Sequence, residues 1–95
     1  MTQHPSVEVR VPGMLRGTVE GEKVVRGEGA SVREVFEDLG RRYPGFSQQI
    51  FDADGQLRRF VNVYVNDEDI RYLGKLEAPV RGGDTVSILP AVAGG

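Results

Sequence analysis

A helix with a defined start and a defined end is the strongest local signal in this sequence. Ser31 and Glu34 form a capping box, in which the serine accepts from the amide of residue 34 and the glutamate reaches back to the amide of residue 31. Pro44 ends the helix, because the residue before a proline is displaced from the α region. The pattern predicts one amphipathic helix over 32–42. Its apolar face is built by Val32, Val35, Phe36, Leu39 and Tyr43.

Most of the remaining chain has the two-residue period of β-strands. We expect strands at 7–11, 22–26, 58–65, 70–72 and 85–89, turns at 52–55 and 66–69, and irregular segments at 14–21 and 44–51. The last strand should stop before Pro90, which cannot donate to a sheet ladder.

This order of elements predicts an α+β fold with two layers. One helix crosses between an opening pair of strands and three later strands, and the compact solution is the ubiquitin-like β-grasp. In it a mixed sheet has one main helix on one face, and the first and last strands pair in parallel at the centre. We expect one domain over 6–90, a disordered arm at 1–5 and a flexible tail at 91–95.

The tail is the most unusual segment, because a core strand runs through a proline into five small residues. Ala91, Val92, Ala93 and Gly94 precede Gly95, and fully extended they reach about 17 Å beyond the fold. The two glycines lack Cβ atoms and can thread a narrow channel. A carboxylate at Gly95 is open to attack but unreactive until it is activated, most simply by adenylation.

Composition excludes several other functions. The chain has no cysteine, hence no disulfide, thiolate nucleophile or cysteine-based metal site. A net charge of −2 gives no electrostatic case for nucleic-acid binding. No signal peptide or membrane-spanning run is present, so we expect no membrane partner and a cytoplasmic location. His4 stands alone in the N-terminal arm and suggests no metal or catalytic site.

The predicted strand at 58–65 has two different faces. Its valines, at 61, 63 and 65, suit the core, whereas Phe60, Asn62 and Tyr64 should point outward. Leu89 should point outward on the neighbouring last strand. We predict that Phe60, Tyr64 and Leu89, with Arg59 beside them, form a surface that docks partner proteins.

The second half of the chain resembles the prokaryotic ubiquitin-like sulfur carriers. The residues that carry this resemblance are 59–71, RFVNVYVNDEDIR, and 83–95, GDTVSILPAVAGG. The group includes the small subunit of molybdopterin synthase and the thiamin sulfur carrier. The likeness is greatest to the actinobacterial carrier that serves cysteine synthesis.

The resemblance implies a function that lies in the tail. An E1-like enzyme would adenylate the Gly95 carboxylate with ATP, and a sulfur donor would displace AMP to leave a thiocarboxylate. The partners implied are that enzyme, a sulfur-accepting synthase, which in the cysteine branch uses pyridoxal phosphate, and a metal-dependent peptidase. The chain itself would bind no cofactor and would not be an enzyme.

Two other functions use the same residues differently. A ubiquitin-like modifier would transfer the activated Gly95 to lysine amines, and a plain β-grasp interaction domain would have an inert tail. Besides cysteine synthesis, the resemblance is compatible with carriers whose sulfur serves the synthesis of thiamin, molybdopterin or secondary metabolites.

Overall fold

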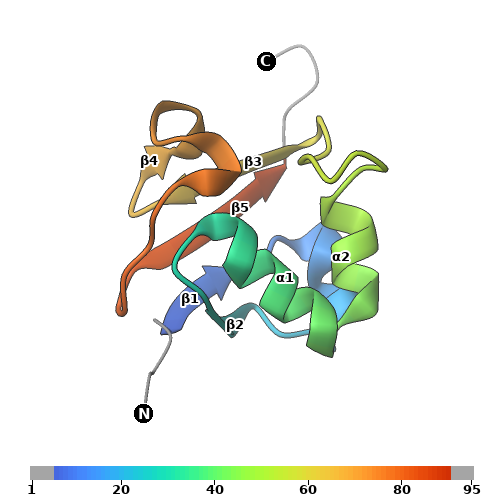
Figure 1. The fold of residues 1–95 in the computed structure, drawn as a ribbon. Coiled ribbons are helices and arrows are strands. Elements are labelled where there is room, and N and C mark those ends of the chain that lie inside the picture. Colours follow the sequence, from blue (N-terminus) through green and yellow to red (C-terminus); the bar gives the residue numbers. More distant parts are fainter. Residues whose placement is uncertain (1–5, 91–95) are drawn as a thin grey trace.

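The computed structural model describes residues 6–90, which form a mixed sheet with helices on one face (Figure 1). The central pair of strands is parallel, and the other pairs are antiparallel. This confirms the predicted β-grasp, including the parallel pairing of the first and last strands. The strands are β1 (Ser6–Arg10), β2 (Val24–Glu28), β3 (Val61–Val65), β4 (Glu68–Asp69) and β5 (Thr85–Pro90), in the order β2-β1-β5-β3-β4.

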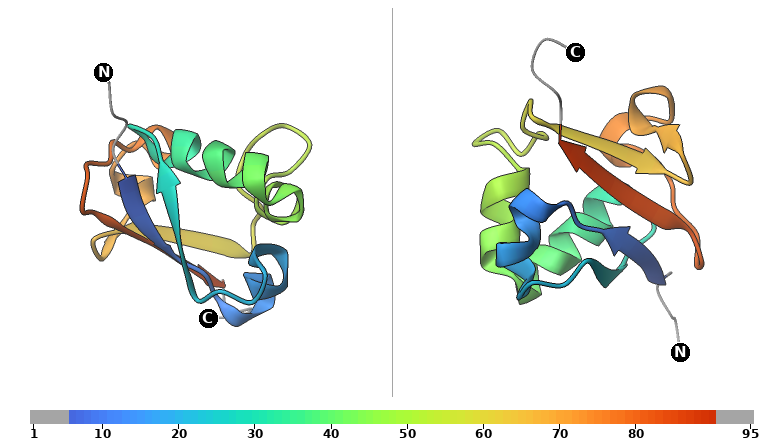
Figure 2. Two further views of the ribbon diagram at one scale, coloured as in Figure 1. Left: turned by 90° about the horizontal axis from the view of Figure 1, so that it is seen from below. Right: turned by 180° about the vertical axis from the view of Figure 1, so that it is seen from behind.

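The core lies between the inner face of the sheet and α1 (Val32–Arg42), which has the predicted bounds (Figure 2, left). Alternate valines of β1 and β3 turn inward and belong to one buried cluster with Phe36 and Leu39 of α1. The Ser31 hydroxyl accepts from the amide of Glu34 at 3.2 Å, as expected. The Glu34 carboxylate accepts from the amide of Ala30, at 2.9 Å, instead of the amide of Ser31. The hydrogen bond of the Glu34 carboxylate therefore goes to the amide one residue before the predicted one.

Two segments expected to be irregular are helical. Pro44 begins α2 (Pro44–Ile50), because a proline that stops one helix also suits the first position of the next. Phe46 and Ile50, one helical turn apart, are buried, and the Phe46 ring packs edge-on against Phe36 with centroids 5.7 Å apart. The segment after β1 is a 3₁₀ helix, η1 (Gly13–Val19), which buries two apolar side chains.

Some strand bounds also differ from the prediction. β2 begins and ends two residues later than expected, and β3 begins at Val61 because the Val61 amide donates to the carbonyl of Arg58 in a turn. The turn after β3 is restricted to Asn66 and Asp67, both at positive φ, as a two-residue hairpin requires. The expected strand at 70–72 is a 3₁₀ helix, η2 (Ile70–Tyr72), and a third, η3, spans Lys75–Glu77.

The last strand includes Pro90, one residue more than predicted. Pro90 lies opposite Val61, while β1 pairs with β5 only as far as Ser87. The Asn66 amide donates to the carbonyl of Thr85, so the residues of β5 that bond to β3 are 85, 87 and 89. The nitrogen of Pro90 therefore faces the side beyond the end of β1. No ladder hydrogen bond is lost there, and the strand tolerates the proline.

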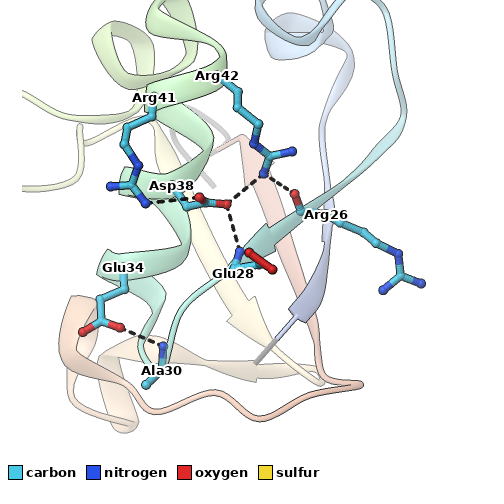
Figure 3. A network of polar contacts seen from close by, with 7 residues as sticks. All are labelled: Arg26, Glu28, Ala30, Glu34, Asp38, Arg41 and Arg42. Carbon is cyan, nitrogen blue, oxygen red and sulfur yellow. Dashed lines mark hydrogen bonds and ion pairs between the residues drawn. The ribbon is translucent and has the colours of Figure 1, made fainter. Parts of the chain in front are cut away.

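A charged cluster fastens the end of β2 to α1 (Figure 3). Asp38 accepts from the amide of Glu28 at 3.0 Å and contacts the guanidinium groups of Arg42 at 2.8 Å and Arg41 at 3.1 Å. Arg42 also donates to the carbonyl of Arg26. Partial burial alone would raise the pKa of Asp38, but the Glu28 amide and the two arginines outweigh it and hold the pKa below its ordinary value.

We predict that Asp38→Asn destabilises the fold by about 1 kcal/mol at pH 7, because it removes two ion pairs and weakens one charge-assisted hydrogen bond. A lowered pKa in the folded state contributes stability above the unfolded pKa, and this contribution is lost as the pH falls through the folded pKa. The difference between the wild type and the variant should therefore shrink below about pH 4. Urea unfolding across this pH range measures it. Glu37→Gln, exposed on the same helix, is the control, and an Asp38 effect that is equal at all pH values would contradict the prediction.

Candidate functional site

The face of the sheet opposite α1 is open within residues 6–90 (Figure 2, right). Strand alternation decides which side chains it presents, because the inward positions are taken by the buried valines and isoleucine. In the register of β3 and β5, Asn62 lies opposite Leu89 and Tyr64 lies opposite Ser87. These four outward side chains form adjacent cross-strand pairs on one surface.

Two of the predicted apolar residues, Tyr64 and Leu89, lie on this surface, and Phe60 lies in the turn just before Val61, which pairs with Pro90 at the end of β5. Leu89 is 48% exposed and Phe60, just before β3, is 41% exposed, while Tyr64 is half-buried. Segment 44–51 does not cover them, because α2 packs against α1 and η1, and its Phe46 and Ile50 belong to the core. We call Phe60, Tyr64 and Leu89 the apolar surface. Its role in docking stays a prediction.

The structure distinguishes between the arginines near the apolar surface. Arg71 is held by Asp69 at 2.7 Å, and this contact, with the hydrogen bond from the Arg71 amide, lowers the pKa of Asp69. Arg58 donates twice to the carbonyl of Gln48, at 3.2 and 3.0 Å, and this neutral partner does not compensate its positive charge. Arg59, the predicted docking cation, is exposed and forms no ion pair within residues 6–90. It is therefore available to a partner.

A hollow of about 460 Å³ next to the apolar surface is lined by Arg10 and Arg16, which the sequence analysis did not predict as site residues. Arg10 lies opposite Ser87 at the end of β1, and Arg16 of η1 donates to the carbonyl of Val11 at 3.0 Å. Leu89 and Tyr64 line the same hollow. The outward position of Arg10 in the alternation of β1 was the available signal, but only the parallel β1–β5 pairing places it beside the apolar surface.

The predicted reactive residue, Gly95, and the tail residues Ala91, Val92, Ala93 and Gly94 lie outside the described residues, as does His4. The described chain ends at Pro90, opposite Val61. It therefore ends next to Phe60 and Leu89, at the edge of the apolar surface. A partner that holds this surface would also hold the start of the tail.

The described residues contain no cluster that suggests chemistry of their own. No polar or charged residue among 6–90 is buried, and within that range no three His, Cys, Asp or Glu side chains lie close enough to hold a metal ion. None of the helices in this range is long and apolar enough to cross a membrane.

Comparison with known proteins identifies a family that matches this chain. The model of the ThiS family matches residues 9–95, a range that includes the whole predicted tail. The sulfur carrier protein CysO of Mycobacterium tuberculosis is 46% identical over 92 residues, which cover 95% of this chain and 99% of CysO.

Solved structures give the same result. A chain in the crystal structure of the Amycolatopsis orientalis BexX/CysO complex has a TM-score of 0.85 and 49% identity, covering 94% of this chain and 99% of that one. The small archaeal modifier protein SAMP1 of Methanosarcina acetivorans has a TM-score of 0.82 and 29% identity, covering 99% and 100%. The resemblance inferred from 59–71 and 83–95 therefore extends over the whole fold.

Proposed function

This chain belongs to the ThiS family, and on that basis we propose that it is a sulfur carrier for biosynthesis, with cysteine synthesis as its pathway. The observation that carries the proposal is the near-complete match to CysO together with a family match that continues through Gly95. A tail of small residues that follows directly on Pro90, beside the predicted docking surface, would give that match a physical reason.

The proposed reaction takes place at the carboxylate of Gly95. An E1-like enzyme joins this carboxylate to the α-phosphate of ATP and releases pyrophosphate. A sulfur donor then attacks the acyl carbon, the bond to AMP breaks, and a thiocarboxylate remains. Activation is required, because a carboxylate that is ionised at neutral pH is a poor acyl donor.

In this proposal the folded domain presents the tail to partner enzymes and carries out no chemical step itself. The partners would be the E1-like enzyme, a sulfur-accepting synthase that uses pyridoxal phosphate and a metal-dependent peptidase. ATP and all cofactors would be bound by these enzymes. A cytoplasmic location, a flexible tail at 91–95 and a domain spanning 6–90 belong to the same proposal.

The test is the intact mass of the protein after incubation with ATP, sulfide and a candidate E1-like enzyme. We expect the mass to increase by one sulfur-for-oxygen exchange and to stay unchanged when ATP is omitted. A mass that stays unchanged with every E1-like enzyme encoded in the same genome would contradict the proposal and leave an inert β-grasp domain.

A second function is favoured by the similarity to SAMP1, which is named as a modifier protein. In that case the activated Gly95 would form isopeptide bonds with lysines of other proteins. The same mass experiment with added cell extract separates the two functions, because a modifier forms covalent adducts of higher mass and a carrier is recovered alone with its sulfur.

A further inference from the structure

The first three residues of β3 have a neighbouring strand on one side only. β5 pairs with all of β3, but β4 pairs only with Tyr64 and Val65. Because alternate residues of an antiparallel strand bond in the same direction, Asn62 and Tyr64 turn their main-chain groups to β5. The main chains of Val61 and Val63 face the other side. The Val61 amide donates to the carbonyl of Arg58, and the pairing of Tyr64 with Asp69 uses the Val63 carbonyl, which leaves the Val61 carbonyl and the Val63 amide at the edge.

A groove of about 290 Å³ lies along this edge. Its floor includes the apolar side chains of Leu57, Ile70 and Leu76. Its walls come from the turn before β3 and from the segment that contains η2 and η3. The groove therefore combines a strand edge with an apolar floor, which are the two features that a peptide adding to a sheet uses.

The rim of the groove is strongly basic, although the chain as a whole is acidic. Four cations line it, Arg58, Arg59, Arg71 and Lys75, against one carboxylate, Asp69. Asp69 neutralises Arg71, while Arg58 is bonded only to a neutral carbonyl. Arg59 and Lys75 form no ion pair within residues 6–90. The groove therefore has a net charge of +3 in a chain of net charge −2.

We propose that this groove binds an extended acidic segment of a partner protein, which adds to β3 as a further strand. Alternate side chains of such a segment point to opposite sides, so apolar residues can contact the floor while carboxylates contact the rim. The ligand is not a second copy of this chain, because pairing two β3 edges would bring the basic rims together. This proposal does not depend on Gly95 or on sulfur transfer.

The test uses the full chain and a blocked seven-residue peptide that alternates glutamate with valine. We expect the peptide to shift the amide resonances around Val63, Leu57 and Lys75 and to protect the Val63 amide from hydrogen exchange. A peptide that alternates lysine with valine should not bind. The double variant Arg59→Glu, Lys75→Glu should bind the acidic peptide about tenfold or more weakly, because like charges then meet at the rim.

Two controls separate strand addition from simple charge attraction. The variant Lys23→Glu, Arg81→Glu has the same net charge as the groove variant, but neither residue lines the groove, so it should bind like the wild type. Two further acidic peptides have every second amide N-methylated, one at the odd positions and the other at the even positions. Both keep the charge of the parent peptide. The peptide whose methyl groups lie on the side that pairs with β3 should lose binding. The proposal would be overturned if both methylated peptides bound as well as the parent, if tripolyphosphate caused the same shifts at Val63, or if no peptide bound.

Discussion

Deletion of Gly95 is expected to abolish thiocarboxylate formation and to leave the fold unchanged. The variant still ends in a glycine carboxylate, at Gly94, so its chemistry is preserved and only its reach is shortened. An extended residue spans about 3.4 Å, and a misplacement of about 1 Å at a reacting atom can cost 100-fold in rate. We therefore expect the rate of adenylation by the E1-like enzyme to fall by at least about 100-fold. One alanine added after Gly95 should lower the rate by a similar factor, because the carboxylate then lies one residue beyond the position where the enzyme activates it.

Intact mass after a timed reaction measures this loss, and thermal unfolding should show the same midpoint for all tail variants. Gly82→Ala is the matched control: no atom lies within 4 Å of its added Cβ, so both reactivity and stability should be unchanged. Normal thiocarboxylate formation by the protein that lacks Gly95 would contradict the prediction, because it would show that the reach of the tail does not limit activation.

The bounds of α1 could be predicted from local signals, and the sheet topology could be predicted from the order of the elements. Ser31 and Pro44 mark the two ends of α1 directly in the sequence, and the order of strands around one helix leaves few compact arrangements. The parallel pairing of β1 with β5 follows from that order. These features need no knowledge of side-chain packing.

The predicted secondary structure was wrong where a residue has two possible roles and where an element is very short. Pro44 ends one helix and begins another, and only the burial of Phe46 and Ile50 decides for a second helix. The edge strand β4 consists of Glu68 and Asp69, which is too short for any periodicity to show. Tertiary contacts make these choices, so a single sequence does not reveal them.

The candidate site shows the same division. Strand alternation was enough to place Tyr64 and Leu89 on one outer face. It could not tell that Arg71 is neutralised by Asp69 while Arg59 is not, since that depends on side-chain geometry. Nor did it give the register of β1 against β5, which sets Arg10 opposite Ser87 and brings it into the same hollow as Leu89.

The apolar surface should contribute strongly to partner binding without contributing much to the fold. We expect the double variant Phe60→Ala, Tyr64→Ala to raise the KM of the E1-like enzyme for this protein by about 30-fold or more, because truncation of aromatic anchors at an interface commonly costs at least 2 kcal/mol. The kcat should change little, since the double variant leaves the proposed reactive tail unaltered. Because Phe60 is exposed and Tyr64 is half-buried, the midpoint of thermal unfolding should fall only slightly.

Val24→Ala provides the comparison that gives this prediction its meaning. Val24 is 44% exposed, close to the 41% of Phe60, and it lies on β2, separated from β5 by β1. If exposed apolar area anywhere on the molecule served binding, both variants would raise KM. If the apolar surface is the docking site, only the loss of Phe60 and Tyr64 will do so, because Phe60 precedes Val61, the partner of Pro90, and Tyr64 lies on β3 beside β5, whereas Val24 lies on β2. An unchanged KM in the double variant, with the fold intact, would rule out this surface and leave the hollow at Arg10 and Arg16 as the next part of the outer face to test.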